Sequence, residues 1–124
     1  MKYLCLIYSN ENDPAANPPL DSDANQPIID GYVQFGMEAG GAGVLPGGDA
    51  LMPTSTARTV RVTGGATVAT DGPFAETKEQ LGGYYLIDCE TFDEAVEWAA
   101  KIPHAAMGSI EVRPVQEFDI PDLA

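Results

Sequence analysis

Charged residues that could do chemistry gather in residues 71–83, which read DGPFAETKEQLGG. A carboxylate such as Asp71 can move a proton, and a cation such as Lys78 can stabilise a carbonyl or an enolate-like charge. We expect Glu76 and Lys78 at the mouth of a ligand cavity. Structural roles suit the same residues, because an Asp before Gly-Pro is typical of an Asx turn and charges on one helical turn are usually solvated.

Arg113 is a further candidate, since it alternates with the apolar Ile110 and Val112 in a strand-like run. The alternation predicts that its side chain points to the face of the sheet opposite the helices. A guanidinium buried there needs an acidic partner such as Glu111 or Asp71, or a bound anion. We therefore expect Arg113 either to bind a small anionic ligand or to form a structural salt bridge.

Tyr85 lies in the apolar run 84–89 and is a candidate ligand-binding residue. Its hydroxyl shares the face of Arg113 if the neighbouring Leu86 points toward the helices. Packing of the ring in the core is the alternative, because tyrosine carries a large apolar body behind its polar tip.

His104 is the single histidine and directly follows Pro103, which predicts a connecting loop and a surface side chain. Cys5 and Cys89 lie in strand-like runs without metal-ligand spacing, so we expect buried thiols rather than a disulfide or a metal centre. The glycine-rich residues 40–43 lack the Gly-Lys-Ser/Thr sequence of a phosphate-binding loop. No cofactor and no metal site are expected.

The elements that position these residues begin with a strand over residues 2–8, apolar in both alternate sets and therefore covered on both faces. Residues 9–26 contain three prolines and predict a surface loop. A helix then begins at a cap formed by Asp23 or Asn25 and ends at Gly40-Gly41. Its apolar stripe consists of Ile28, Tyr32, Phe35 and Ala39.

A tight hairpin is predicted next, because two alternating β-branched runs flank Gly64-Gly65. Thr91 and Glu94 stand in a capping-box relation that begins a second helix. The remaining predictions are a kinked strand within 43–52, hairpin strands over 59–63 and 66–70, a loop over 71–83 with one helical turn at 75–80, a strand over 84–89, an end of the second helix at Pro103, a strand over 109–115 and a surface tail over 116–124.

This order of elements is βαββαβ with a hairpin and loop inserted in its middle, which predicts an α+β sandwich of the ferredoxin-like type. Two helices cover only one face of such a sheet, yet the runs 2–8 and 84–89 are apolar on both. An exposed apolar face of this size is unusual for a monomer. We therefore expect a homodimer in which the two sheets face each other and enclose a cavity.

Length and charge narrow the classes of partner. The 124 residues form a single expected domain. The formal net charge of −13 repels phosphate backbones and anionic lipids, so nucleic acid and membranes are not expected as direct partners. The longest apolar run is too short to span a bilayer and no signal-peptide pattern precedes it, which predicts a cytoplasmic protein.

The stretch from Asp71 to Gly83, together with the strand that begins Tyr84-Tyr85, the helix EAVEWAA and the strand IEVRPV, closely resembles the DGPF branch of the YCII-related proteins. The resemblance covers nearly the whole chain. It implies a bacterial, dimeric αβ barrel, in a family often found beside extracytoplasmic-function sigma factors and without an assigned biochemical role. The YCII relatives carry a His–Asp dyad in the cavity. This sequence departs from that pattern, because His104 follows the second helix and the first helix offers Tyr32 but no imidazole.

Two classes of function follow. The first is a non-catalytic module that binds a small anionic or carbonyl metabolite in the sheet-lined cavity and acts with a partner, for which the resemblance suggests a sigma factor. The second is a small cofactor-independent lyase or isomerase in which Asp71 acts as the acid–base group and Arg113 or Lys78 stabilises negative charge.

Overall fold

Four antiparallel strands and two helices form the body of the protein, in a computed structural model that describes residues 1–119. The predicted tail lies outside the described residues from 120 onward. In chain order the elements are β1 (Lys2–Ser9), α1 (Gln26–Gly41), β2 (Gly47–Ala50), β3 (Arg58–Thr63), β4 (Ala66–Asp71), β5 (Gln80–Asp88), α2 (Phe92–Ala99) and β6 (Ser109–Pro114), with 3₁₀ helices at Asp23–Asn25, Thr54–Thr56 and Pro103–Ala106.

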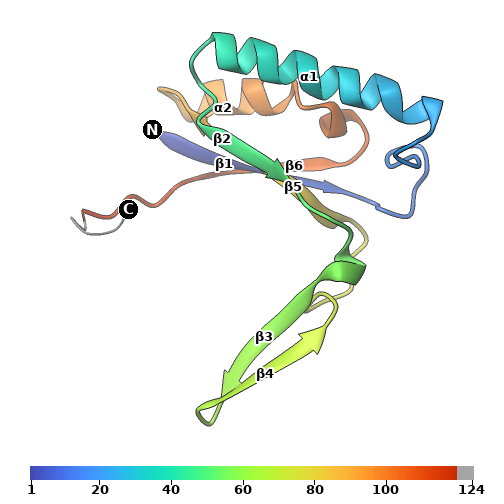
Figure 1. Cartoon of the computed structure of the whole chain (residues 1–124). Coiled ribbons are helices and arrows are strands. Elements are labelled where there is room, and N and C mark those ends of the chain that lie inside the picture. Colours follow the sequence, from blue (N-terminus) through green and yellow to red (C-terminus); the bar gives the residue numbers. More distant parts are fainter. Residues whose placement is uncertain (120–124) are drawn as a thin grey trace.

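The main sheet has the strand order β2-β5-β1-β6, and both helices cover the same face of it (Figure 1). β1 lies in the centre, paired antiparallel with β5 on one side and with β6 on the other. β3 and β4 form a separate two-stranded hairpin. The predicted ferredoxin-like α+β fold, with a hairpin inserted between its second and third core strands, is confirmed.

The hydrophobic core lies between the helices and one face of the sheet. Tyr3, Cys5 and Ile7 of β1 point into it and are buried. The alternate residues Leu4, Leu6 and Tyr8 point to the helix-free face and are partly exposed. The two apolar faces predicted for this strand are therefore present, and only one of them is covered by the chain's own helices.

The two helices begin differently. Thr91 accepts a hydrogen bond from the backbone N–H of Glu94 at 3.1 Å, as the capping-box pattern predicted. The Glu94 carboxylate accepts one from the N–H of Glu90 at 3.2 Å, one residue before the N–H that a capping box uses. α1 has Asn25 at its N-cap position, but this side chain makes no capping hydrogen bond, and Asp23 lies in the preceding 3₁₀ helix. The prediction that the side chain of Asp23 or Asn25 caps the first helix was therefore wrong, although Asn25 occupies the N-cap position.

The β3–β4 hairpin, called the arm below, turns at Gly64 and Gly65, whose φ angles are 57° and 80°. Two successive positive φ values are those of the tight turn that the Gly-Gly pair predicted. The arm projects from the side of the sheet opposite the helices (Figure 1). No residue of β3 or β4 is buried.

The segment after the arm differs from its prediction. β4 continues to Asp71 and β5 already begins at Gln80, so the expected loop is shortened from both ends. The helical turn predicted over 75–80 is absent, and bends and extended backbone take its place. Hydrogen bonds made by Gln80 and by the backbone of β5 extend the strand and compete with a local turn, which explains the difference.

Alkaline pH is expected to destabilise the fold through Cys5, because burial raises the pKa of this thiol from 9.0 to about 11. The native state then binds more protons than the unfolded state, so this contribution is complete below pH 9 and is lost as the pH rises toward 11. Urea unfolding should show a lower free energy of unfolding at about pH 10.5 than at about pH 8. Cys5→Ala should make this decrease smaller, by up to about 1.4 kcal/mol per pH unit. Equal pH dependence in both proteins would contradict this role of Cys5.

Candidate functional site

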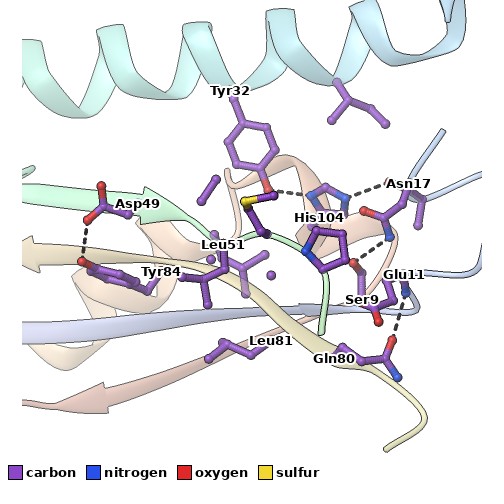
Figure 2. Close-up of a pocket in the computed structure, with 18 of the residues that line it drawn as sticks. Ser9, Glu11, Asn17, Tyr32, Asp49, Leu51, Gln80, Leu81, Tyr84 and His104 are labelled. Carbon is purple, nitrogen blue, oxygen red and sulfur yellow. Dashed lines mark hydrogen bonds between the residues drawn. The ribbon is translucent and has the colours of Figure 1, made fainter. Parts of the chain in front are cut away.

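A cavity of about 710 Å³ lies beside the N-terminal half of α1. Its walls come from the end of β1, the loop at residues 16–20, the end of β2 and residues 51–53, and the start of β5 (Figure 2). With α1 and the 3₁₀ helix Pro103–Ala106, six separate parts of the sequence therefore meet around it. Tyr32 enters the cavity from α1, and His104 enters it from the 3₁₀ helix Pro103–Ala106.

Tyr32 and His104 form a hydrogen-bonded pair in the cavity wall. The Tyr32 hydroxyl lies 2.6 Å from His104 Nδ1, and His104 Nε2 lies 2.8 Å from the carbonyl oxygen of Ala16. A carbonyl oxygen can only accept, so Nε2 carries a proton and donates it to Ala16. In the neutral imidazole Nδ1 is then the acceptor, and Tyr32 donates its hydroxyl proton to it. The phenol oxygen keeps its lone pairs available to a ligand.

The close approach of α1 to the 3₁₀ helix brings this pair together. Gly31 faces Pro103, and a Cβ at position 31 would lie 3.0 Å from Pro103 Cγ. The next residues on the two elements are Tyr32 and His104, whose ring centroids are 5.6 Å apart. A glycine at position 31 therefore allows the spacing at which the hydroxyl reaches the imidazole.

The surroundings of Tyr32 and Tyr85 favour the protonated form of both side chains. Burial, together with Tyr85 close by, raises the pKa of the Tyr32 phenol, and the backbone of His104 offsets only part of this effect. Burial also raises the pKa of Tyr85. Both phenols are therefore neutral at physiological pH.

His104 was predicted to be a surface residue, and this prediction was wrong. The side chain is 9% exposed and both ring nitrogens have partners. The signal in the sequence was weak, because a lone histidine after a proline is typical of a loop. Its two partners are 72 and 88 residues away in the chain, so no local pattern could have indicated them.

The wall beyond the pair is held by polar side chains. Asn17 donates to Ser9 Oγ at 3.0 Å, and the N–H of Glu11 donates to Gln80 Oε1 at 3.0 Å (Figure 2). The Glu11 carboxylate accepts hydrogen bonds from the backbone and the hydroxyl of Thr54. These contacts join the end of β1, the start of β5 and the segment that leads into the arm.

At the other end of the cavity the Tyr84 hydroxyl donates to Asp49 at 2.6 Å (Figure 2). This hydrogen bond, together with the negative charge of Asp49, raises the pKa of Tyr84. Asp49 and Tyr84 lie at the rim, with side chains on the helix-free side of the sheet, so Glu11 is the carboxylate that faces the cavity, and within residues 1–119 no lysine or arginine lines it. The electrostatics of the cavity therefore disfavour an anionic ligand and permit a neutral one.

The candidate residues of the charged segment lie away from this cavity. Asp71 ends the arm, where its side chain is 94% exposed and lies 3.5 Å from the guanidinium of Arg58. Glu76 and Lys78 are exposed in the segment between the arm and β5. The structure of the single chain does not bring these three residues to Tyr32 and His104.

Arg113 lies on the helix-free face, opposite Leu4 of β1, as its alternation predicted. Its Nε donates to Glu111 at 2.6 Å, which is one of the partners expected for it. The hydrogen bond and the charge of Glu111 raise the pKa of Arg113 further. The side chain of Arg113 is 70% exposed in the single chain.

Tyr85 lies on the helix face, so the arrangement in which it shares a face with Arg113 was wrong. It pairs with Cys5 in the sheet, and its ring packs on Phe35 with centroids 4.8 Å apart. The neighbouring Leu86 pairs with Leu4 and points to the helix-free face instead. Tyr85 nevertheless lines the cavity from the sheet. Its ring lies against Gly48 of β2, where an added Cβ would come within 2.4 Å of the ring.

Within 1–119 no group of three or more His, Cys, Asp or Glu side chains could hold a metal ion. Among the helices of the same residues, none is long and apolar enough to cross a bilayer.

The chain is similar to known proteins in its sequence. A family model described as the YCII-related domain matches residues 1–119. An uncharacterised protein of Rhizobium meliloti (strain 1021) is 39% identical over 117 residues, 93% of this chain and 92% of that protein. A solved structure of 5-chloro-2-hydroxyhydroquinone dehydrochlorinase from Burkholderia phenoliruptrix AC1100, in complex with 2,5-dihydroxybenzoquinone, is 13% identical and covers 95% of this chain and 96% of its own, with a TM-score of 0.49.

Proposed function

The chain belongs to the YCII-related family, and from this premise we propose that it binds a small neutral metabolite bearing hydroxyl or carbonyl groups in the cavity beside α1. The observation that carries the proposal is the Tyr32–His104 pair, in which a partly buried phenol contacts a buried imidazole that is held by Ala16. A volume of about 710 Å³ lies in the range of small-molecule sites.

The pair also selects the chemistry of the ligand. Because Tyr32 donates its own proton to His104, its oxygen offers lone pairs and best accepts a hydrogen bond from a ligand hydroxyl. The carboxylate of Glu11 repels negative charge at the same site, and within residues 1–119 no lysine or arginine lines the cavity. Of the anionic and the carbonyl ligand expected from the sequence, the carbonyl compound therefore suits this cavity better, and a neutral hydroxyl compound suits it as well.

Titration calorimetry with resorcinol and with 3,5-dihydroxybenzoate tests this proposal, because the two probes differ only by a carboxylate. Resorcinol should bind more tightly than the benzoate. Tyr32→Phe should weaken resorcinol about tenfold, the effect of one lost hydrogen bond of about 1.4 kcal/mol. Tyr8→Phe is the matched control, because Tyr8 lies on the helix-free face and outside the cavity. Equal binding by all three proteins, or a preference for the benzoate, would contradict the proposal.

A second candidate is proton transfer at the same site, which the fixed tautomer favours. A substrate proton passes to the Tyr32 oxygen while the Tyr32 proton passes to His104 Nδ1, leaving an imidazolium that still donates to Ala16. This role replaces the one first considered for Asp71, which lies in the arm. It predicts that the protein speeds exchange of the α-protons of dihydroxyacetone into D₂O and that Tyr32→Phe abolishes the effect. Binding without exchange would leave only the first function.

The helix-free face supports the further proposal of a homodimer. It carries apolar side chains from β1 and β5, including Leu4, Leu6 and Leu86, that the chain itself leaves partly exposed. A second copy packed sheet to sheet would cover them and would place Arg113 between the two sheets.

Anion binding by Arg113, with Lys78 or Glu76 nearby, and a sigma-factor partner stay predictions. Co-purification with a purified sigma factor tests the partner, and it is carried out at concentrations where the chain is dimeric and where it is monomeric.

A further inference from the structure

The arm is the part of the chain that the cavity and the fold leave unexplained. It is a ribbon of two six-residue strands that hydrogen-bond only to each other in the sheet topology. Val60 and Val62 lie on one face of it and are 60% and 68% exposed. An isolated two-stranded hairpin is marginally stable in water, so a ribbon that extends from the body needs a surface to pack against.

Charge indicates what that surface is. Arg58, Arg61 and Lys78 are three of the six basic residues of the chain. Residues 58–78 contain two acidic residues and therefore carry a formal charge of +1, whereas the rest of the chain carries −14. The Val60 and Val62 face carries Arg58 paired with Asp71 and so has no net charge of its own. It can therefore approach the strongly acidic body of another copy of the same chain without the repulsion that two such bodies exert on each other.

We propose that the arm is an intersubunit clasp, which packs its Val60 and Val62 face against a second copy of this chain. This inference rests on the proposed homodimer and adds to it the element that closes the interface. The arm projects on the side of the sheet opposite the helices, which is the side that the second copy covers (Figure 1). In a two-fold dimer each arm meets the same surface of its partner, so every contact occurs twice.

The areas agree with a shared role of sheet and arm. From strand spacings, one face of the arm measures about 20 by 10 Å and the helix-free sheet face about 20 by 20 Å. Together they offer about 600 Å² per copy, close to the roughly 800 Å² per partner of stable interfaces. The sheet alone falls well short of this value, so the arm supplies a large share of the contact.

The clasp is connected directly to the cavity. Leu51, Met52 and Pro53 line the cavity and lead into the arm, and the returning strand enters the cavity wall again at Gln80. Glu11 holds the outgoing segment through Thr54. A second copy that fixes the arm therefore also fixes the wall through which both of its strands pass.

Sedimentation equilibrium of the full chain tests the clasp. The double variant Val60→Asp, Val62→Asp places two carboxylates on the packing face and should weaken the dimer at least tenfold. Val68→Asp is the matched control, because Val68 pairs with Arg61 on the opposite face of the same arm and is also exposed. It should leave the dimer constant within about twofold. An unchanged dimer in the double variant, or equal loss in the control, would overturn the clasp.

Hydrogen exchange of the unaltered protein gives a test that needs no variant. Backbone amides of β3 and β4 should be protected at concentrations where the chain is dimeric and should exchange rapidly on dilution to monomer. Protection that does not depend on concentration would overturn the clasp while leaving the dimer intact. A monomer at all concentrations would overturn the dimer and the clasp together, whereas resorcinol binding reports on the cavity separately.

Discussion

Replacing His104 with leucine is expected to lower the free energy of unfolding by about 3 kcal/mol. The substitution leaves the Tyr32 hydroxyl without its acceptor and the Ala16 carbonyl without its donor, and each unsatisfied buried group costs about 1–3 kcal/mol. Chemical denaturation measures the loss. An unchanged midpoint would show that the imidazole does not hold the helix and the loop together.

The double variant His104→Leu, Tyr32→Phe serves as the control for this prediction. Removing both polar partners leaves no orphaned hydroxyl at Tyr32, so part of the loss, about 1–2 kcal/mol, should be recovered. The coupling energy between the two positions then measures the hydrogen bond itself. Strictly additive losses would mean that Tyr32 and His104 stabilise the fold independently.

Gly108→Ala is expected to be the most damaging single methyl group in the body of the protein. A Cβ at this position would lie 2.1 Å from the carbonyl oxygen of Tyr8 and 3.0 Å from Ser9 Cα. Backbone atoms cannot move aside as a flexible side chain can, so the connection into β6 must shift away from β1. We expect a loss of about 3 kcal/mol, measured by thermal and chemical unfolding.

Gly36→Ala is the matched control for that variant. It adds the same methyl group inside α1, where nothing lies within 4 Å of the new Cβ. Since glycine is a poor residue in a helix interior, the change should raise stability by about 0.5–1 kcal/mol. Opposite signs for the two variants are expected, and a tolerated methyl group at position 108 would contradict the packing described for β6.

The architecture could be predicted because its signals are local. The unbroken apolar run of β1, the Gly64-Gly65 turn and the Thr91 cap each depend on residues close together in the chain. The order of the elements then leaves few topologies, and the ferredoxin-like arrangement is one of them. The helical turn predicted at 75–80 did not form, because at Gln80 the backbone pairs with β1 as part of β5.

The cavity could not be predicted in the same way. Its polar pair joins a residue on the apolar stripe of α1 to one in a loop-like segment, and a backbone carbonyl of a third segment fixes the imidazole. Nothing in the types of these residues marks them as neighbours. Attention to the charged stretch instead favoured Asp71 and Lys78, which the single chain places on or next to the exposed arm.

A crystal structure of the protein soaked with resorcinol tests the central claim most directly, because it shows where the ligand lies. We expect the ring in the cavity beside α1, with one hydroxyl within about 3 Å of the Tyr32 oxygen and the Tyr32–His104 hydrogen bond preserved. Resorcinol bound on the helix-free face beside Arg113, with the cavity empty, would contradict the assignment of the site.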